Sequence, residues 1–150
     1  FHLEVRKTPS HLIGTPGLMT WVEDELELKG DKPPIYDRFP LISEEVYGPV
    51  LRGTSDAKGM FPGWAQSKDV LIIYCEPPLD NILDFGVRAQ MDGVIEHARA
   101  IVARYTVVMH RFANKGWGVV HYDYTKTDSY SKVRSIVQQY LDKYPRRGTW

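Results

Sequence analysis

The chain has only one cysteine, Cys75, among its 150 residues. A single thiol cannot form an internal disulfide, so the sequence is not that of a small secreted domain framed by disulfides. This cysteine usage favours an intracellular, reducing compartment and does not say which one. The chain begins at Phe1 rather than at methionine, which indicates a processed chain or a fragment of a larger protein.

Long apolar runs are also missing. The longest one, Val70 to Tyr74, is far shorter than the roughly 20 residues that a membrane-spanning helix needs. The sequence therefore predicts no membrane span. Hydrophobic residues make up 43% of the chain and charged residues 25%, which is typical of globular proteins, and the length predicts a single domain over residues 1–150.

Motifs that identify a chemistry are lacking as well. The five histidines form no HExxH or HxxxH pair, and there is no CxxC. His121 and Asp123 have the spacing of two ligands on one strand face, but the sequence offers no third ligand. The stretch 53–59 lacks the GK[ST] ending of a phosphate-binding loop. We therefore predict neither a metal site nor a cofactor.

The strongest pattern lies between Asp80 and Lys115, where apolar residues recur every three or four positions. This spacing predicts one long helix. At 1.5 Å per residue such a helix would be about 50 Å long, whereas a compact domain of this size is roughly 40 Å across. We therefore expect the helix to be interrupted, near Gly86 or Gly93, or to project beyond the domain.

The rest of the chain predicts shorter elements. Period-two and helical spacing predict strands at 1–7, 69–75 and 117–124 and helices at 20–29 and 128–144.

Two stretches are harder to interpret. Residues 45–52 suggest a short edge or bulged strand, because Pro49 has no amide hydrogen for a sheet. Residues 31–40 contain three prolines and predict a loop, at the start of a Pro- and Gly-rich extended segment from about 31 to 68. A strand is the alternative for residues 20–29, since its apolar residues also fit a period of two.

This order of elements predicts an α+β fold. The first six elements follow the βαββαβ order of a ferredoxin-like sheet, with one long central helix and an added C-terminal helix.

Charge is zero overall but unevenly distributed. From Arg99 to the end there are ten basic and three acidic residues, a net charge of +7. This asymmetry predicts an acidic partner or the packing of one half against the other, with a solvated helix surface as the alternative.

One candidate catalytic set combines Cys75, His121 and Asp123. Cys75 ends the most apolar predicted strand, and His121 with Asp123 would supply a base and a group that orients it. The set requires the two strands to be neighbours. The alternative for Cys75 is a buried core thiol.

Candidate binding residues lie along the long helix and in the segment before it. His97, Arg104 and Arg111 recur every seven residues on one flank, and Lys115 continues it. Nearby aromatic residues suggest a basic and aromatic surface for single-stranded RNA, although the RNP1 motif is absent. The aromatic candidates for this surface or for a protein interface are Trp117, Trp64 and Phe61.

The absence of an assembled catalytic motif and the many aromatic residues favour a non-catalytic protein-binding or structural subunit of a larger assembly, with a protein partner or a second copy of the chain. The alternatives are an enzyme of unrecognised type centred on Cys75, His121 and Asp123, and an RNA-binding module.

Overall fold

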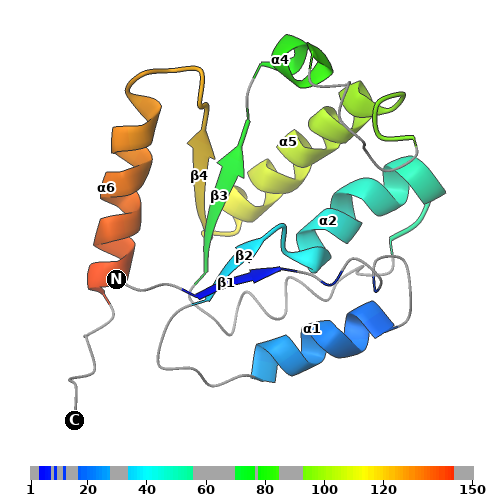
Figure 1. Ribbon diagram of the computed structural model, residues 1–150, viewed down its shortest axis with the longest axis horizontal. Helices are drawn as coiled ribbons and strands as arrows, with labels where there is room; N and C mark the ends of the chain where they lie inside the picture. The colour runs from blue at the N-terminus through cyan, green and yellow to red at the C-terminus, as the bar shows by residue number, and fades with distance from the viewer. Residues whose placement is uncertain are drawn as a thin grey trace. The chain divides into compact units, whose positions relative to one another are not determined.

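The structure is a computed structural model, and it describes residues 4–7, 9, 12, 17–27, 34–55, 70–76, 78–84 and 93–143. The chain forms two compact units, residues 1–67 and residues 68–150, and each is described by itself. Figure 1 shows their helices and strands. The single domain expected from the chain length stays a prediction.

The first unit is built on two parallel strands with a helix between them in the chain. Strand β1 (Glu4–Lys7) pairs with β2 (Pro34–Asp37), and helix α1 (Gly17–Glu27) connects them. Parallel strands need such a crossover because a tight hairpin joins only antiparallel ones. The expected N-terminal strand and the helix after it are confirmed.

The Glu25 carboxylate ties α1 to both strands. It accepts hydrogen bonds from Arg6 Nη1 on β1, at 3.0 and 2.9 Å, and from the Tyr36 hydroxyl on β2 at 3.2 Å. The Glu25 side chain is only 11% exposed, so this carboxylate needs its charged partner. On the buried side of α1, Leu18 and Val22 are one helical turn apart and are almost fully covered.

Helix α2 (Pro40–Tyr47) and one π-helical turn, η2 (Gly48–Arg52), occupy the place where the sequence predicts an edge strand. The strand expected at 45–52 is therefore wrong. Pro40 is the first residue of α2, where an amide hydrogen has no helical partner and its absence costs little. Pro49 is the second residue of η2, which continues α2 without a break. The missing donor that suggested a strand edge therefore lies where the α-helix changes to a π-helical turn.

The loop expected at 31–40 is also wrong in part, because β2 forms within it. Pro34 is the first residue of the strand, which is a position that proline tolerates. Three of the four β2 residues are exposed, so buried and exposed residues do not alternate along the strand. The sequence therefore shows no period-two pattern of apolar residues there. The segment predicted to be extended, about 31 to 68, thus includes a strand and two helical elements, and its part beyond Ser55 lies outside the described residues up to 69.

The second unit holds the other parallel pair. Its elements are β3 (Leu71–Cys75), α4 (Leu79–Asp84), α5 (Ala98–Asn114), β4 (Gly118–Tyr122) and α6 (Ser129–Asp142). β3 pairs with β4 in parallel, α5 contacts β4, and α6 contacts both strands (Figure 1). The strands and the C-terminal helix expected in this half of the chain are confirmed.

The long helix expected from Asp80 to Lys115 is interrupted. α4 ends at Asp84, a turn covers residues 93–97, and α5 begins at Ala98. Gly93 has a φ of 79°, in the left-handed region where glycine avoids the Cβ penalty. The predicted interruption is therefore confirmed at Gly93, whereas Gly86 lies outside the described residues.

The apolar stripe of α5 forms the core of this unit. Val108, Met109 and Phe112 are at most 1% exposed, and Ile101 is 5% exposed. Tyr105 of α5 stacks on Tyr74 of β3, with ring centroids 5.5 Å apart. Spacing in the sequence thus identified the buried side of α5 correctly.

The mixture of helices and strands makes the fold α+β. In a ferredoxin-like, split βαβ arrangement another strand separates the two parallel strands of each unit. Here β1 pairs directly with β2, and β3 with β4, so the described strands do not confirm that order. Among the described helices, none is long and apolar enough to cross a membrane.

Candidate functional site

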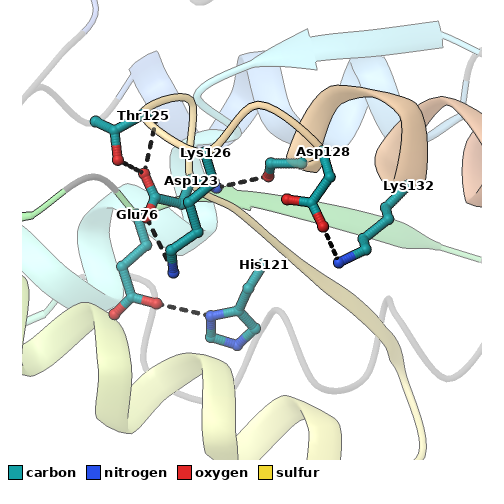
Figure 2. A network of polar contacts seen from close by, with 8 residues as sticks. Glu76, His121, Asp123, Thr125, Lys126, Asp128 and Lys132 are labelled. Atoms are coloured by element: carbon teal, nitrogen blue, oxygen red, sulfur yellow. Dashed lines mark hydrogen bonds and ion pairs between the residues drawn. The ribbon is translucent and has the colours of Figure 1, made fainter.

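The carboxyl ends of β3 and β4 lie at the same edge of their sheet, because the strands are parallel and in register from Leu71 opposite Gly118 to Cys75 opposite Tyr122. In open α/β sheets, sites often form just beyond the carboxyl ends of the strands. Here this edge gathers polar side chains from His121 of β4 and from residues that follow the two strands, and Figure 2 shows them from close by.

Glu76 and His121 form the central contact of this edge. His121 Nδ1 lies 2.7 Å from Glu76 Oε2. Glu76 directly follows β3, and its backbone N–H donates to the carbonyl of Tyr122 at 2.9 Å, so the sheet ladder holds the glutamate beside β4. The side chain of His121 is 45% exposed and that of Glu76 is 32% exposed, which leaves the pair accessible from solvent.

Groups from β3 and α5 surround this pair. The Tyr74 ring meets the His121 ring edge to face, with centroids 5.4 Å apart. The Thr106 hydroxyl on α5 lies 3.3 Å from Glu76 Oε1 and 3.1 Å from the carbonyl of Val102. These contacts, one from β3 and one from α5, orient the imidazole and the carboxylate.

This arrangement has a defined acid–base chemistry. When Glu76 accepts a hydrogen bond from Nδ1–H, Nε2 of the neutral imidazole carries the free lone pair. Such a ring nitrogen accepts a proton or a hydrogen bond from a bound group. The His110 ring, on α5, is 6.5 Å from the His121 ring between centroids.

Asp123 lies at the same edge but has different partners. Its Oδ1 accepts from the Thr125 hydroxyl at 2.6 Å and from the Thr125 N–H at 3.0 Å, and its Oδ2 is 3.2 Å from Lys126 Nζ. The Asp123 N–H donates to Ser129 Oγ at 3.1 Å. These bonds stabilise the turn between β4 and α6.

The same bonds set the titration of the two aspartates of this turn. The Thr125 hydroxyl, with smaller contributions from the Thr125 N–H and Lys126, lowers the pKa of Asp123 below its usual value. The pKa of Asp128 is also lowered, chiefly by the hydrogen bond and charge of Lys132, with which it forms an ion pair. Both carboxylates are therefore charged at neutral pH.

The structure does not bring Cys75, His121 and Asp123 together as a nucleophile, a base and an orienting acid. Cys75 pairs with Tyr122 in the register, whereas His121 pairs with Tyr74, so Cys75 and His121 point to opposite faces of the pleated sheet. The imidazole meets Glu76, and the Asp123 carboxylate is held by Thr125 and Lys126. Cys75 is exposed and is not a core thiol.

Glu76 is the residue of this edge that the sequence did not single out. It is 45 residues from His121 in the chain, and only the strand register brings the two together. Its place directly after a predicted strand was the available signal, because residues that follow parallel strands share one edge. Among the described residues, no group of three or more His, Cys, Asp or Glu side chains could hold a metal ion.

The predicted binding residues lie mostly on and around α5. Arg104 and Arg111 are half-buried and seven residues apart, about two turns, so they share one flank of the helix. His97 is exposed at the N-terminal end of α5. Two further candidates follow α5: Lys115 Nζ lies 6.0 Å from the centroid of the Trp117 ring, and that ring packs on Phe112 with centroids 4.5 Å apart. The last two candidates, Phe61 and Trp64, lie outside the described residues.

The outer side of α5 carries a feature that the sequence did not reveal. Val107 is 57% exposed, and Ala100 and Ala103 beside it are exposed as well. Their spacing of three and four residues places them in one row. The signal was present, since Val107 directly precedes Val108 of the buried stripe and must point elsewhere.

Comparison of the chain with protein-family models, curated proteins and solved structures finds no match.

Proposed function

We propose that the chain is a non-catalytic, protein-binding or structural subunit or domain of a larger assembly, and that the outer side of α5 is its binding surface. The observation that carries this proposal is the exposure of Val107, 57%, in the middle of a 17-residue helix. An apolar patch that faces solvent and has a polar rim is typical of an interface with another protein.

The rim of this surface is basic. α5 carries Arg99, Arg104 and Arg111 and no acidic residue, and Arg99 is exposed next to Ala100. Complementary charge increases the association rate and selects the partner more than it adds affinity. A protein partner with an acidic surface segment fits this helix best.

The test is to place a charge at Val107, the largest side chain of the row that it forms with Ala100 and Ala103. Val107→Glu would weaken the complex between the native chain and the proteins that co-purify with it by at least about tenfold, since a buried unpaired carboxylate costs more than 1.4 kcal/mol. Ile136→Glu on α6 is the matched control, because Ile136 is an exposed apolar residue on another helix. Equal loss in both variants, or no loss in either, would count against α5 as the binding surface.

RNA would also be attracted to a basic helix, and the same reagents separate the two partners. RNA binding would weaken steeply with salt and with Arg99→Glu, and it would be largely insensitive to Val107→Glu. Trp117 already packs on Phe112 and is half-buried, which reduces its use as a stacking platform for bases. The packing of Trp117 on Phe112 therefore favours a protein over RNA as the partner.

A second candidate function, acid–base catalysis, is favoured by the 2.7 Å contact between His121 and Glu76 and by the accessibility of both. The base is His121 Nε2, and Glu76 orients the ring. Hydrolysis of an activated ester such as p-nitrophenyl acetate, at a rate per site well above that of free imidazole, would support it. The rate should then fall to background in His121→Gln and persist in His110→Gln, and a rate equal to that of free imidazole would exclude it.

Three broader predictions belong with this proposal and await their own tests. They are an intracellular location, the ferredoxin-like order of the strands, and a single domain over residues 1–150.

A further inference from the structure

We propose that His110 and His121 together bind one divalent transition-metal ion of the kind that prefers imidazole ligands, such as Zn²⁺, and that Glu76 holds His121 in the binding orientation. This site goes beyond the proposed function, because neither the protein-binding surface of α5 nor the acid–base candidate uses a metal. All three residues belong to the second unit.

His121 has the surroundings of a metal-binding histidine. Its Nδ1 lies 2.7 Å from Glu76 Oε2, and Figure 2 shows the two groups turned towards each other. When Nδ1–H donates to the carboxylate, the lone pair of Nε2 is free on the other side of the ring. Metal-binding histidines almost always donate their second ring N–H to a carboxylate, a carbonyl or water, which fixes the tautomer and makes the binding nitrogen more basic. Thr106 Oγ1, 3.3 Å from Glu76 Oε1, helps to fix the carboxylate.

His110 provides a second imidazole beside the first. It follows Thr106 by four residues, about one turn, so both lie on the same side of α5. The ring centroids of His110 and His121 are 6.5 Å apart. Both histidines are exposed, so an ion reaches them directly from solvent.

The separation of the two rings suits a shared ion. Zinc lies about 2.0–2.1 Å from the nitrogen of each histidine that binds it, so the centroids of two such rings are roughly 5 to 6.5 Å apart for angles at the metal from tetrahedral to linear. The observed 6.5 Å is at the upper end of this range. A small rotation of the exposed His110 side chain brings the pair to the tetrahedral separation.

The site has two protein ligands. Within the part of the chain that the structure describes, no group of three or more His, Cys, Asp or Glu side chains could hold a metal ion, so water completes the coordination of an ion bound here. We therefore expect reversible binding, weaker than in the closed sites that use four protein ligands. The sequence did not indicate the site, because His110 and His121 are eleven residues apart and match no ligand motif.

Titration of the full chain with ZnCl₂ tests the site, followed by calorimetry and by long-range ¹H–¹⁵N spectra. Zinc should shift Nε2 of His121 and one ring nitrogen of His110, while Nδ1 of His121 keeps its proton. His110→Gln and His121→Gln should each weaken zinc binding at least tenfold. In the double variant the two losses should combine to less than their sum, because either substitution alone removes the chelate.

His97→Gln is the matched control. His97 is also an exposed histidine, but it lies at the other end of α5, more than three turns from His110. This substitution should leave zinc binding unchanged. His2 and His11 are retained in every variant, so they cannot account for a difference between variants.

Glu76→Ala tests the positioning role of the carboxylate. It should weaken zinc binding about tenfold or more, because the carboxylate behind a binding histidine typically contributes that much. The same variant should shift His121 of the zinc-free chain towards the Nε2–H tautomer. Unchanged zinc affinity in Glu76→Ala would overturn this role.

Two outcomes would overturn the shared site. One is a native chain in which zinc shifts neither His110 nor His121. The other is zinc binding that persists in His110→Gln, or that falls equally in His97→Gln. The ester-hydrolysis test remains separate, because acid–base catalysis needs His121 without His110, whereas zinc binding needs both.

Discussion

The His121 ring is oriented by Glu76, which directly follows the neighbouring strand β3. Neutral histidine free in water prefers the tautomer with the proton on Nε2, whereas a carboxylate 2.7 Å from Nδ1 favours the proton on Nδ1. We therefore expect long-range ¹H–¹⁵N spectra to show neutral His121 as the Nδ1–H tautomer. Glu76→Ala should shift the ring towards Nε2–H, and His110, which serves as an internal reference, should not change. An Nε2–H tautomer in the native chain would contradict the contact.

Asp123 makes the stability of the β4–α6 turn dependent on pH. Because Thr125 and Lys126 lower its pKa in the folded chain below the unfolded value of 3.8, its charge stabilises the fold above about pH 3.8. That contribution is lost as the pH falls through the lowered, folded-state pKa. Asp123→Asn should therefore unfold at lower urea concentration than the native chain at pH 7, and the difference should disappear in acid.

A second substitution isolates the cause of this effect. Thr125→Val removes the hydroxyl that lowers the pKa of Asp123 most, so the ¹³C-detected titration of the Asp123 carboxyl should move to higher pH. Asp128 should titrate as before in this variant, since its shift comes mainly from Lys132. An unchanged Asp123 titration would show that Thr125 is not the main cause.

Residue spacing predicted that His121 and Asp123 lie at the carboxyl edge of the β3–β4 sheet, but it did not predict the contact between Glu76 and His121. The sequence placed His121 beside Asp123 because two residues on one strand share a face, and both do lie at the carboxyl edge. Their side chains separate because the chain turns after Tyr122 and Asp123 bonds forward to Thr125. Glu76 becomes the partner of His121 through the parallel register, and the residue spacing in a single sequence does not specify the register between two distant strands.

At the scale of elements, the helical spacing of apolar residues predicted a helix correctly where one side of that helix is buried. The stripe of α5 was predictable because Ile101, Val108, Met109 and Phe112 recur at helical intervals in the core. The segment from 31 to 52 was misassigned because its prolines are compatible with strand edges, loops and helix starts alike. Its strand is mostly exposed and its helix is short, so neither produced a periodicity long enough to recognise.

The two sides of α5 should respond differently to truncation. Phe112 is fully buried and packs on Trp117 at 4.5 Å, so Phe112→Ala should lower the free energy of unfolding by about 3–5 kcal/mol. Val107→Ala, on the exposed side, should change the free energy of unfolding of the monomer by at most about 0.5 kcal/mol. Urea unfolding below the concentration at which the chain associates measures both. Similar losses would mean that Val107 is covered within the monomer.

The end of α5 depends on a glycine. Gly116 has a φ of 82° and no atom within 4 Å of the place where a Cβ would stand, so only the backbone conformation resists a side chain there. Gly116→Ala should cost about 1 kcal/mol in the free energy of unfolding, and Gly116→Asn clearly less, because asparagine tolerates the left-handed region. Equal losses from both substitutions would point to a steric cause.

At the scale of the whole molecule, the two units carry opposite charge. Residues 1–67 contain seven basic and ten acidic side chains, and residues 68–150 contain twelve basic and nine acidic ones, which gives net charges of −3 and +3. The basic bias of the C-terminal third was evident from the sequence. The structure shows which helices contribute to this difference in charge: α1 of the first unit is acidic, and α5 of the second unit is basic.

The second unit should fold without the first. Its buried residues on β3, α5 and α6 all lie between positions 68 and 150, and a chain of 83 residues is long enough to form its own core. We expect the fragment 68–150 to show a cooperative urea transition and dispersed amide spectra in which His121 keeps the Nδ1–H tautomer set by Glu76. Phe112→Ala in the fragment is the matched control, and it should weaken the transition as it does in the full chain. A fragment that is unfolded in buffer would instead support the single 150-residue domain that the chain length predicts, in which the two units stabilise each other.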